Sequence, residues 1–243
     1  MTTLLALDTS SDNCSVALWH QGQLWHDCQQ VPRGHTRLLM PMIRQLLDQA
    51  GAPLAALDGV AFGAGPGSFT GLRITLGVAQ GLAWGLGRPV IPVSCLAATA
   101  AQAARLYQAR QVAVAFDARM DQVYWGAFHC SPGGETGPVV TALGEERVCA
   151  AEAVTLPGAE AVPGVSVTGS WFAAGSGWQA YPDRLKTALS TPMEQIDGTL
   201  NPLARDILLL ALEKYQAGLV VAPEQAEPVY LRNEISWQKL PGR

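Results

Sequence analysis

An internal repeat limits what this chain can fold into more than any other feature of its sequence. The stretches LALDTSSDNCSVAL and VAFDARMDQVYWGAF share one pattern: an apolar run ending in Asp, three further residues, a second Asp and an alternating run. The repeat matches Asp8 with Asp117 and Asp12 with Asp121. Self-similarity in a constant register indicates that one structural unit occurs twice. We therefore expect a duplicated architecture in which each half begins with the same strand and turn.

The first half of the chain predicts the element order βββαβαβα. Runs at residues 3–8, 14–19 and 23–31 have the composition and alternation of a three-stranded meander. Apolar residues at helical spacing predict a helix from residue 35 that Gly51 stops, and Pro41 inside it predicts a kink or a later start. The remaining expected elements are strands at 59–63 and 89–93 and helices at 70–86 and 94–108, the last capped by Ser94.

The second half begins in the same way and then becomes less regular. We expect loops around one or two strands in residues 131–165, a strand at 165–170, a helix at 201–218 and an irregular tail. A duplicated unit of this order is the arrangement of the two-lobed α/β fold of actin-like ATPases and sugar kinases (ASKHA), with the second copy degenerate. The expected lobes are residues 1–108 and 109–243, with the C-terminal helix and tail packing back between them. A fold of this kind does not by itself assign an activity.

Composition predicts a compact globular protein of the cytoplasm. Apolar residues make up 49% and charged residues 15% of the 243 positions, and the net charge is −4 without a run of Lys or Arg. Such a chain is not expected to hold nucleic acid by itself, because that affinity comes mainly from neutralised phosphates. The five cysteines are odd in number and form no Cys-x-x-Cys pair, which favours a reducing compartment. No signal peptide or membrane span is expected, since Asp8 and Arg73 interrupt the apolar stretches.

The glycine-rich stretch GAGPGSFTG, residues 63–71, is the first candidate for a nucleotide site, yet it fits no phosphate-binding motif. No Lys follows Gly71, and Ser68 stands where a dinucleotide motif needs its third Gly. What remains is a helix start at which backbone N–H groups, Ser68 and Thr70 can hold an anion. The alternative is that these hydroxyls only cap the helix, and this interpretation is favoured.

Outside this stretch, the sequence also lacks a recognisable catalytic or metal-binding motif. Asp8 and Asp117 stand where an actin-like ATPase has carboxylates, but no Gly follows them, so turn formation and strand-end capping are favoured. The four histidines form no His-Glu-x-x-His motif and no Cys/His cluster, and no Ser–His–Asp arrangement is marked. The sequence therefore predicts no catalytic residue, no metal site and no bound cofactor, with Ser68, Thr70 and Asp8 as weak candidates for ligand binding.

The helix expected over residues 70–86 carries Gly77, Gly81 and Gly85 on one face. Each Gly in a helix interior costs about 1 kcal/mol relative to Ala, so the stripe needs a compensating gain. Small residues at this spacing let a second helix approach closely. The other faces are apolar, so the helix must be covered on every side. Two interpretations stay open: the helix at 36–50 of the same chain covers the stripe, or another chain docks there.

Five segments together resemble the bacterial TsaB (YeaZ) family, and the resemblance covers nearly the whole chain. They are LLALDTSSDNCSVAL, GPGSFTGLRITLGVAQGLA, DARMDQVYW, GSGWQAYPD and EPVYLRNEISWQKLPG. Members of this family are accessory subunits of the machinery that makes threonylcarbamoyladenosine in tRNA. The resemblance implies a non-catalytic chain that forms a heterodimer with the catalytic subunit TsaD, is joined by the ATPase TsaE, and meets tRNA only through that complex. It leaves open whether the chain forms a homodimer when its partner is absent.

The resemblance also bears on individual residues. The related catalytic subunit TsaD has a His-x-x-x-His metal pair, and Cys95 and Thr99 stand at those positions here, so that metal is not expected. The implied partner surface lies on helices of the first lobe. Its expected residues are Leu39, Ile43, Ile74, Gly77, Val78, Gly81 and Gly85.

Two alternative functions remain on the residues alone. One is an actin-like phosphotransferase that binds ATP itself, and the other is a protease, which needs a nucleophile or a metal that the sequence does not reveal. Contact between tRNA and the tail residues Arg232, Trp237, Lys239 and Arg243 is a further open question, for which a solvated tail or one packed on a lobe is favoured.

Overall fold

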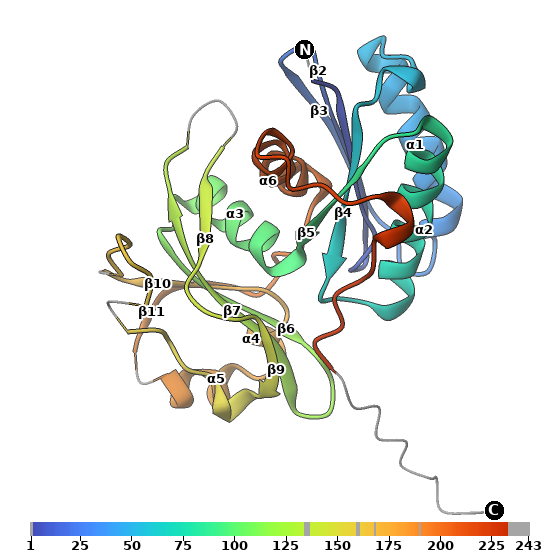
Figure 1. The fold of residues 1–243 in the computed structure, drawn as a ribbon. Coiled ribbons are helices and arrows are strands. Elements are labelled where there is room, and N and C mark those ends of the chain that lie inside the picture. The colour runs from blue at the N-terminus through green and yellow to red at the C-terminus, as the bar shows by residue number, and fades with distance from the viewer. Residues whose placement is uncertain (1, 134–136, 159–160, 168, 190, 233–243) are drawn as a thin grey trace, which may run out of the picture.

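The protein consists of two α/β lobes, each built on a mixed sheet (Figure 1). The computed structural model describes residues 2–133, 137–158, 161–167, 169–189 and 191–232. The first sheet has the strand order β3-β2-β1-β4-β5, and the second has the order β11-β10-β6-β7-β8 with β9 paired to β7. Read from the other edge, the second sheet has the order β8-β7-β6-β10-β11. Each of these strands has the same position and the same direction as its counterpart in the first sheet. The expected duplicated ASKHA fold is confirmed.

The first sheet is covered by helices on both faces. Its strands are β1 (Leu4–Asp8), β2 (Asn13–His20), β3 (Gln23–Gln30), β4 (Gly59–Gly65) and β5 (Val90–Ser94). Every residue of β1 is buried: Leu5 and Leu7 pack on one side, and Leu4 and Ala6 pack on the other. This alternation follows from the period of two in a strand, and burial on both faces explains why β1 is apolar throughout.

The helices of the first half match the expected order. They are α1 (His35–Ala50), the 3₁₀ turn η1 (Leu54–Ala56), α2 (Phe69–Leu86) and α3 (Cys95–Tyr107). Gly51 ends α1 with a left-handed φ of 63°, and the Ser94 hydroxyl caps α3. Of the two outcomes expected from Pro41, the later start is wrong, since the helix begins at His35. The ring removes only the hydrogen bond to the carbonyl of Arg37, and both residues are exposed to water.

The second sheet repeats the pattern of the first with a shortened connection. Its strands are β6 (Gln111–Asp117), β7 (Gln122–Ser131), β8 (Val139–Ala142), β9 (Arg147–Ala150), β10 (Trp171–Ala174) and β11 (Met193–Asp197). Asp8 and Asp117 end the equivalent strands β1 and β6, as the repeat predicts. Where the first unit has α1, the second has the 3₁₀ turn η2 (Ala151–Ala153), and the described residues between η2 and β10 form no further helix.

One strand prediction in this half is wrong. The described residues of the stretch 165–170 form no strand, and the strand β10 begins immediately afterwards. Val165 and Val167 pack against the core of the second lobe without pairing in the sheet. The helices α4 (Gly177–Ala180) and α5 (Pro182–Leu189) follow β10.

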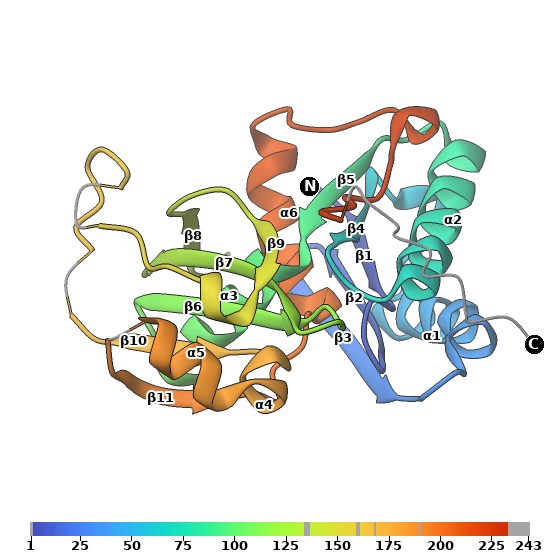
Figure 2. The same ribbon diagram turned by 90° about the horizontal axis from the view of Figure 1, so that it is seen from below.

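The last helix of each unit crosses to the sheet of the other unit. Helix α3 packs on β6 and β7 of the second sheet, and α6 (Ala204–Gln216) packs on β1, β2 and β5 of the first (Figures 1 and 2). The chain then passes through η3 (Pro223–Gln225) over the first lobe. The division at residue 108 stays a prediction, and the helix that it assigns to the second lobe lies on the first sheet. Among the described residues, no helix is both long and apolar enough to span a membrane.

Candidate functional site

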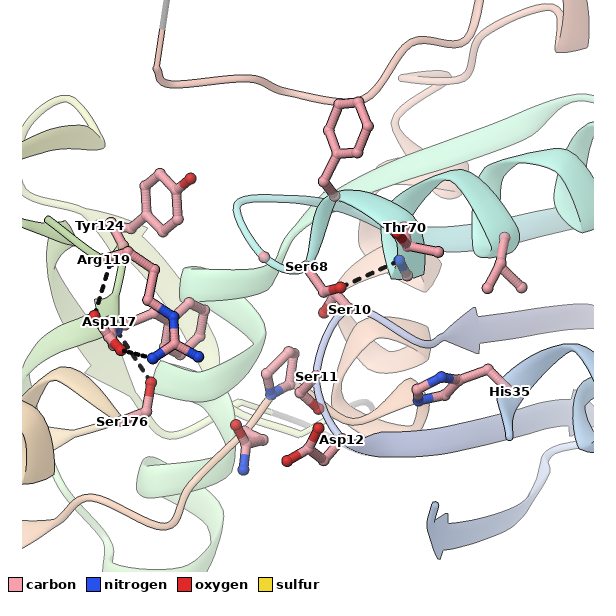
Figure 3. Close-up of a pocket in the computed structure, with 18 of the residues that line it drawn as sticks. Ser10, Ser11, Asp12, His35, Ser68, Thr70, Asp117, Arg119, Tyr124 and Ser176 are labelled. Carbon is pink, nitrogen blue, oxygen red and sulfur yellow. Dashed lines mark hydrogen bonds and ion pairs between the residues drawn. The ribbon is translucent and has the colours of Figure 1, made fainter. Parts of the chain in front are cut away.

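A cleft of about 1070 Å³ opens between the two lobes (Figure 3). The first lobe supplies the turn Ser10–Asp12 after β1 and the starts of α1 and α2. The second lobe supplies the end of β6 and residues Arg119, Tyr124 and Ser176. This is the location at which the duplicated fold brings the ends of β1 and β6 to face each other.

The glycine-rich loop is filled by the chain itself. A Cβ atom at Gly71 would overlap the carbonyl oxygen of Thr9, and one at Gly67 would lie 2.8 Å from both Cβ and the carbonyl oxygen of Ser10. The backbone N–H of Ser68 donates to the carbonyl oxygen of Ser10 at 2.7 Å. These glycines are therefore needed for a close approach between two segments of the chain, and they do not open a cradle for phosphate.

The two hydroxyl candidates lie at the start of α2. Ser68 is the N-cap, and its Oγ accepts a hydrogen bond from the N–H of Gly71 at 3.3 Å. Thr70, in the first turn, is exposed on the wall of the cleft (Figure 3). The position of Ser68 agrees with the capping interpretation, in which the hydroxyl satisfies one of the unpaired N–H groups of the helix start.

Asp8 lies beneath the cleft and not on its wall. Its side chain is fully buried, and Oδ1 accepts hydrogen bonds from the N–H and the hydroxyl of Ser10 at 3.1 and 3.0 Å. Burial raises the pKa of Asp8 to about 7, although the bonds from Ser10 and from the thiol of Cys95 oppose this shift. Ser10 separates the carboxyl from the cleft, which gives Asp8 the role of a turn former.

Asp117 does line the cleft, but its carboxylate is already paired. Arg119 contacts it twice, through its N–H at 2.8 Å and through its guanidinium at 3.0 Å, and the hydroxyl of Tyr181 donates to it at 3.2 Å. Ser176 accepts a hydrogen bond from the N–H of Asp117 at 3.1 Å (Figure 3). Arg119 thus balances the charge that would otherwise face a metal–nucleotide complex.

Cys95 and Thr99, which stand at the positions of the histidine pair of TsaD, are both buried in this chain. Cys95 is the first residue of α3 and is fully buried, and the hydroxyl of Thr99 donates to the carbonyl oxygen of Cys95 at 3.0 Å. Burial raises the pKa of the Cys95 thiol well above its usual value, which disfavours the nucleophilic thiolate. Within the described part of the chain, no group of three His, Cys, Asp or Glu residues is placed to hold a metal ion.

The glycine stripe of α2 faces solvent. Gly77, Gly81 and Gly85 are exposed, and a Cβ atom at any of them would meet nothing within 4 Å. The interpretation in which α1 covers the stripe is therefore wrong. Trp84, seven residues after Gly77 and hence on the same side of the helix, is 66% exposed. Sequence reasoning did not include Trp84 in the surface, although its spacing from Gly77 was a usable signal.

Two expected interface residues lie in the core instead. Leu39 and Ile43 are 1% and 2% exposed and pack against the first sheet, so they cannot reach a partner. The apolar face of α1 points inward because it covers β2 and β3 on the side of the sheet where α2 covers β4. Ile74 and Val78 remain partly exposed beside the glycine stripe. We use the name "α2 face" for Ile74, Gly77, Val78, Gly81, Trp84 and Gly85.

Comparison with known proteins identifies a family model and relatives whose names all concern threonylcarbamoyl modification of tRNA. Residues 29–237 match the family model of TsaD, tRNA N6-adenosine threonylcarbamoyltransferase. The chain is 41% identical to the tRNA threonylcarbamoyladenosine biosynthesis protein TsaB of Escherichia coli (strain K12) over 99% of both chains. It is 40% identical to the protein of the same name from Haemophilus influenzae over 99% of this chain and 98% of the relative.

A solved structure shows the same architecture over almost the full length. YeaZ from Pseudomonas aeruginosa superposes with a TM-score of 0.82 at 45% identity, covering 95% of this chain and 100% of that one. Identity of this level along nearly the entire sequence, together with the duplicated two-lobed topology, leaves one conclusion. The chain belongs to the TsaB family.

Proposed function

We propose that this chain is a non-catalytic accessory subunit for threonylcarbamoyl transfer to the adenosine beside the tRNA anticodon. In this proposal it works in the cytoplasm by binding the catalytic subunit TsaD through the α2 face. The ATPase TsaE joins that pair, and tRNA is contacted only through the complex. The relatives named TsaB support the pathway, and the site geometry supports the accessory role.

The observation that carries the proposal is the uncovered glycine stripe. Three glycines in a helix interior cost about 3 kcal/mol together relative to Ala, and nothing in the described chain packs against them. A helix of another protein with small or apolar side chains can approach this backbone closely and recover that cost through packing. Trp84 beside the stripe offers a large, exposed aromatic side chain of the kind that is enriched where partners bind.

The non-catalytic part of the proposal is supported by the interior of the cleft. Its glycine loop is packed against Thr9 and Ser10, and the carboxylate of Asp117 is paired with Arg119. An ATP-binding phosphotransferase needs free backbone N–H groups and a carboxylate for the metal at these places. The protease alternative gains no nucleophile from Cys95, which is buried and has a raised pKa.

The interface is tested by placing a large side chain in the stripe. We expect Gly81→Leu to fold normally, because the Cβ position is open, and to weaken binding to TsaD by at least about 100-fold, or about 2.7 kcal/mol. Gly144→Leu is the matched control: Gly144 is also exposed with nothing within 4 Å, but it lies in the turn between β8 and β9. Calorimetric titration with TsaD measures both variants, and wild-type affinity of Gly81→Leu would refute the interface.

The accessory role is tested separately by reconstitution. TsaD, TsaE, a source of threonylcarbamoyl-adenylate and tRNA are combined with and without this chain, and modified adenosine is counted. We expect product only when the chain is present, and we expect Cys95→Ala and Ser68→Ala variants to support it. Equal product without the chain contradicts the accessory role, and micromolar ATP binding by the isolated chain would favour the phosphotransferase alternative.

A further inference from the structure

Residues 219–232 form a strap that lies across the first lobe after α6. In Figures 1 and 2 it passes beside α2 and runs on toward the turn between β6 and β7. Val221 and Val90 exchange two backbone hydrogen bonds of 2.9 Å, and Val229 donates to the carbonyl oxygen of Ala64 at 2.7 Å. The strap is therefore joined to the ends of two sheet strands, β5 and β4.

Helix α2 holds the middle of the strap. The side-chain amide of Gln80 donates to the carbonyl oxygens of Pro223 and Ala226 at 2.8 and 3.1 Å, and Ala226 is buried in the core of the first lobe. Gly65 allows the close approach that follows, because a Cβ atom there would lie 2.7 Å from the carbonyl oxygen of Val229. These contacts leave the strap little freedom relative to the first lobe.

At the cleft the strap reaches the residue that begins α2. The rings of Tyr230 and Phe69 lie 5.8 Å apart, and Phe69 lines the cleft. The guanidinium of Arg73 lies 3.7 Å from the centre of the Phe69 ring and donates to the hydroxyl of Tyr230 at 3.3 Å. This aromatic–cation cluster fixes the strap at the rim of the cleft on the side of the first lobe.

Two residues later the strap contacts the opposite wall. The guanidinium of Arg232 donates to the carbonyl oxygen of Ala118 at 3.0 Å and to the side-chain oxygen of Gln122 at 2.5 Å. These two residues flank the hairpin turn of β6 and β7, in which Arg119, Met120 and Asp121 have positive φ values of 63°, 55° and 59°. One planar side chain thus holds both ends of a turn whose backbone is in the left-handed region.

We propose that the strap is a latch: Arg232 ties the second lobe to the first across the mouth of the cleft and sets how far the two lobes open. On the opposite side the lobes are joined through the crossed helices α3 and α6. Opening of the cleft about that side must separate Arg232 from the hairpin or Tyr230 from Phe69. The proposal concerns the isolated chain and does not depend on the accessory role.

Distance measurements between the lobes test the latch. Spin labels are attached to the full-length chain at Thr36→Cys and Gln179→Cys, which lie on opposite walls of the cleft. The more accessible native cysteines are removed by Cys28→Ser and Cys149→Ser. Pulsed electron–electron double resonance then gives the distribution of distances between the two spin labels. We expect Arg232→Ala to lengthen the mean distance and broaden the distribution, because the bridge to the hairpin is lost. Arg44→Ala, which removes an exposed guanidinium from α1, is the matched control and should leave the distribution unchanged.

Two further variants separate the latch from a local effect. Gln80→Ala loosens the strap far from the hairpin, and we expect it to broaden the same distribution. Arg232→Lys keeps the charge but loses the second terminal nitrogen, which contacts the sulfur of Met120 at 3.6 Å, and we expect an intermediate result. Hydrogen exchange provides a second readout, in which amides 118–122 exchange about tenfold faster in Arg232→Ala than in the parent. An unchanged distribution in Arg232→Ala, or equal broadening in Arg44→Ala, overturns the proposal.

Discussion

Arg105 and Asp206 form a two-pronged ion pair that joins the crossed helices α3 and α6. The distances are 2.8 Å from Nε to Oδ1 and 2.9 Å from Nη2 to Oδ2. The side chain of Asp206 is completely buried, and that of Arg105 is 20% exposed. Since each of these helices packs on the sheet of the other unit, the pair connects the two halves of the duplicated fold at its centre.

Removal of the arginine should destabilise the whole molecule. In Arg105→Ala the carboxylate of Asp206 stays buried without its partner, and we expect a loss of about 3 kcal/mol in the free energy of unfolding. Urea unfolding followed by circular dichroism measures this loss. Arg110→Ala, an exposed arginine shortly after α3, serves as the control and should change stability by less than about 0.5 kcal/mol. Equal stabilities for the two variants would contradict a structural role for the pair.

Glycine-to-alanine substitutions at two positions of α2 should change the stability of the chain in opposite directions. Gly71→Ala places a methyl group into the carbonyl oxygen of Thr9, so we expect a loss of at least about 2 kcal/mol. Gly81→Ala meets nothing within 4 Å and gains helix propensity, so we expect a stabilisation of about 1 kcal/mol in the isolated chain. Thermal unfolding of both variants provides the comparison, and a shift of the same sign in both would refute the assignment of these glycines.

The first lobe was predictable because its elements have clear periods. Strand β1 is apolar throughout, α1 has helical spacing and ends at Gly51, and α3 starts at Ser94, so local signals agree with the final structure. The sequence repeat that matches Asp8 with Asp117 also correctly predicts that β1 and β6 are equivalent strands ending at these residues. The strand predicted at 165–170 is wrong because Val165 and Val167 alternate like a strand, yet they pack on the core beside β10.

The site was harder to predict because its decisive contacts leave no pattern in the sequence. Leu39 and Ile43 look alike whether an apolar helix face meets its own sheet or a partner, and only the structure shows that it meets the sheet. The strap is held largely by backbone groups of Pro223, Ala226 and Val229, which any residue type supplies. Its tail continues into Trp237, Lys239 and Arg243, which lie outside the described residues.

The buried carboxyl of Asp8 should make stability depend on pH. Its pKa in the folded chain is about 7, against an ordinary value of 3.8, so between these values the folded chain keeps a proton that the unfolded chain has released. Raising the pH across this window therefore destabilises the native state, with a total on the order of 4 kcal/mol, and the cost is constant above it. We expect Asp8→Asn to gain stability relative to the parent from about pH 4 to pH 7.

Urea unfolding of the parent and of Asp8→Asn at several pH values measures this difference directly. The groups that face Asp8, Ser10 and the thiol of Cys95, do not ionise in this range, since burial raises the pKa of Cys95. Glu146 also has a pKa raised by burial, but it is present in both proteins, and its effect cancels in the comparison. A difference that does not vary with pH would show that Asp8 is ionised in the folded chain.

The five thiols should fall into reactive and unreactive groups. Cys28 is exposed and Cys149 is partly exposed, whereas Cys14, Cys95 and Cys130 are buried. Burial also raises the pKa of Cys14 to about 11 and that of Cys130 to about 12, so little thiolate is present in these groups at neutral pH. With a disulfide reagent at about pH 8, we expect Cys28 to react first and Cys149 more slowly. We expect the three buried thiols to react only after unfolding in guanidinium.

The Cys28→Ser variant should lack the fast phase of the reaction, and peptide mapping should assign each modified cysteine. Modification of Cys95 in the folded chain as fast as that of Cys28 would contradict its burial and would favour the protease alternative.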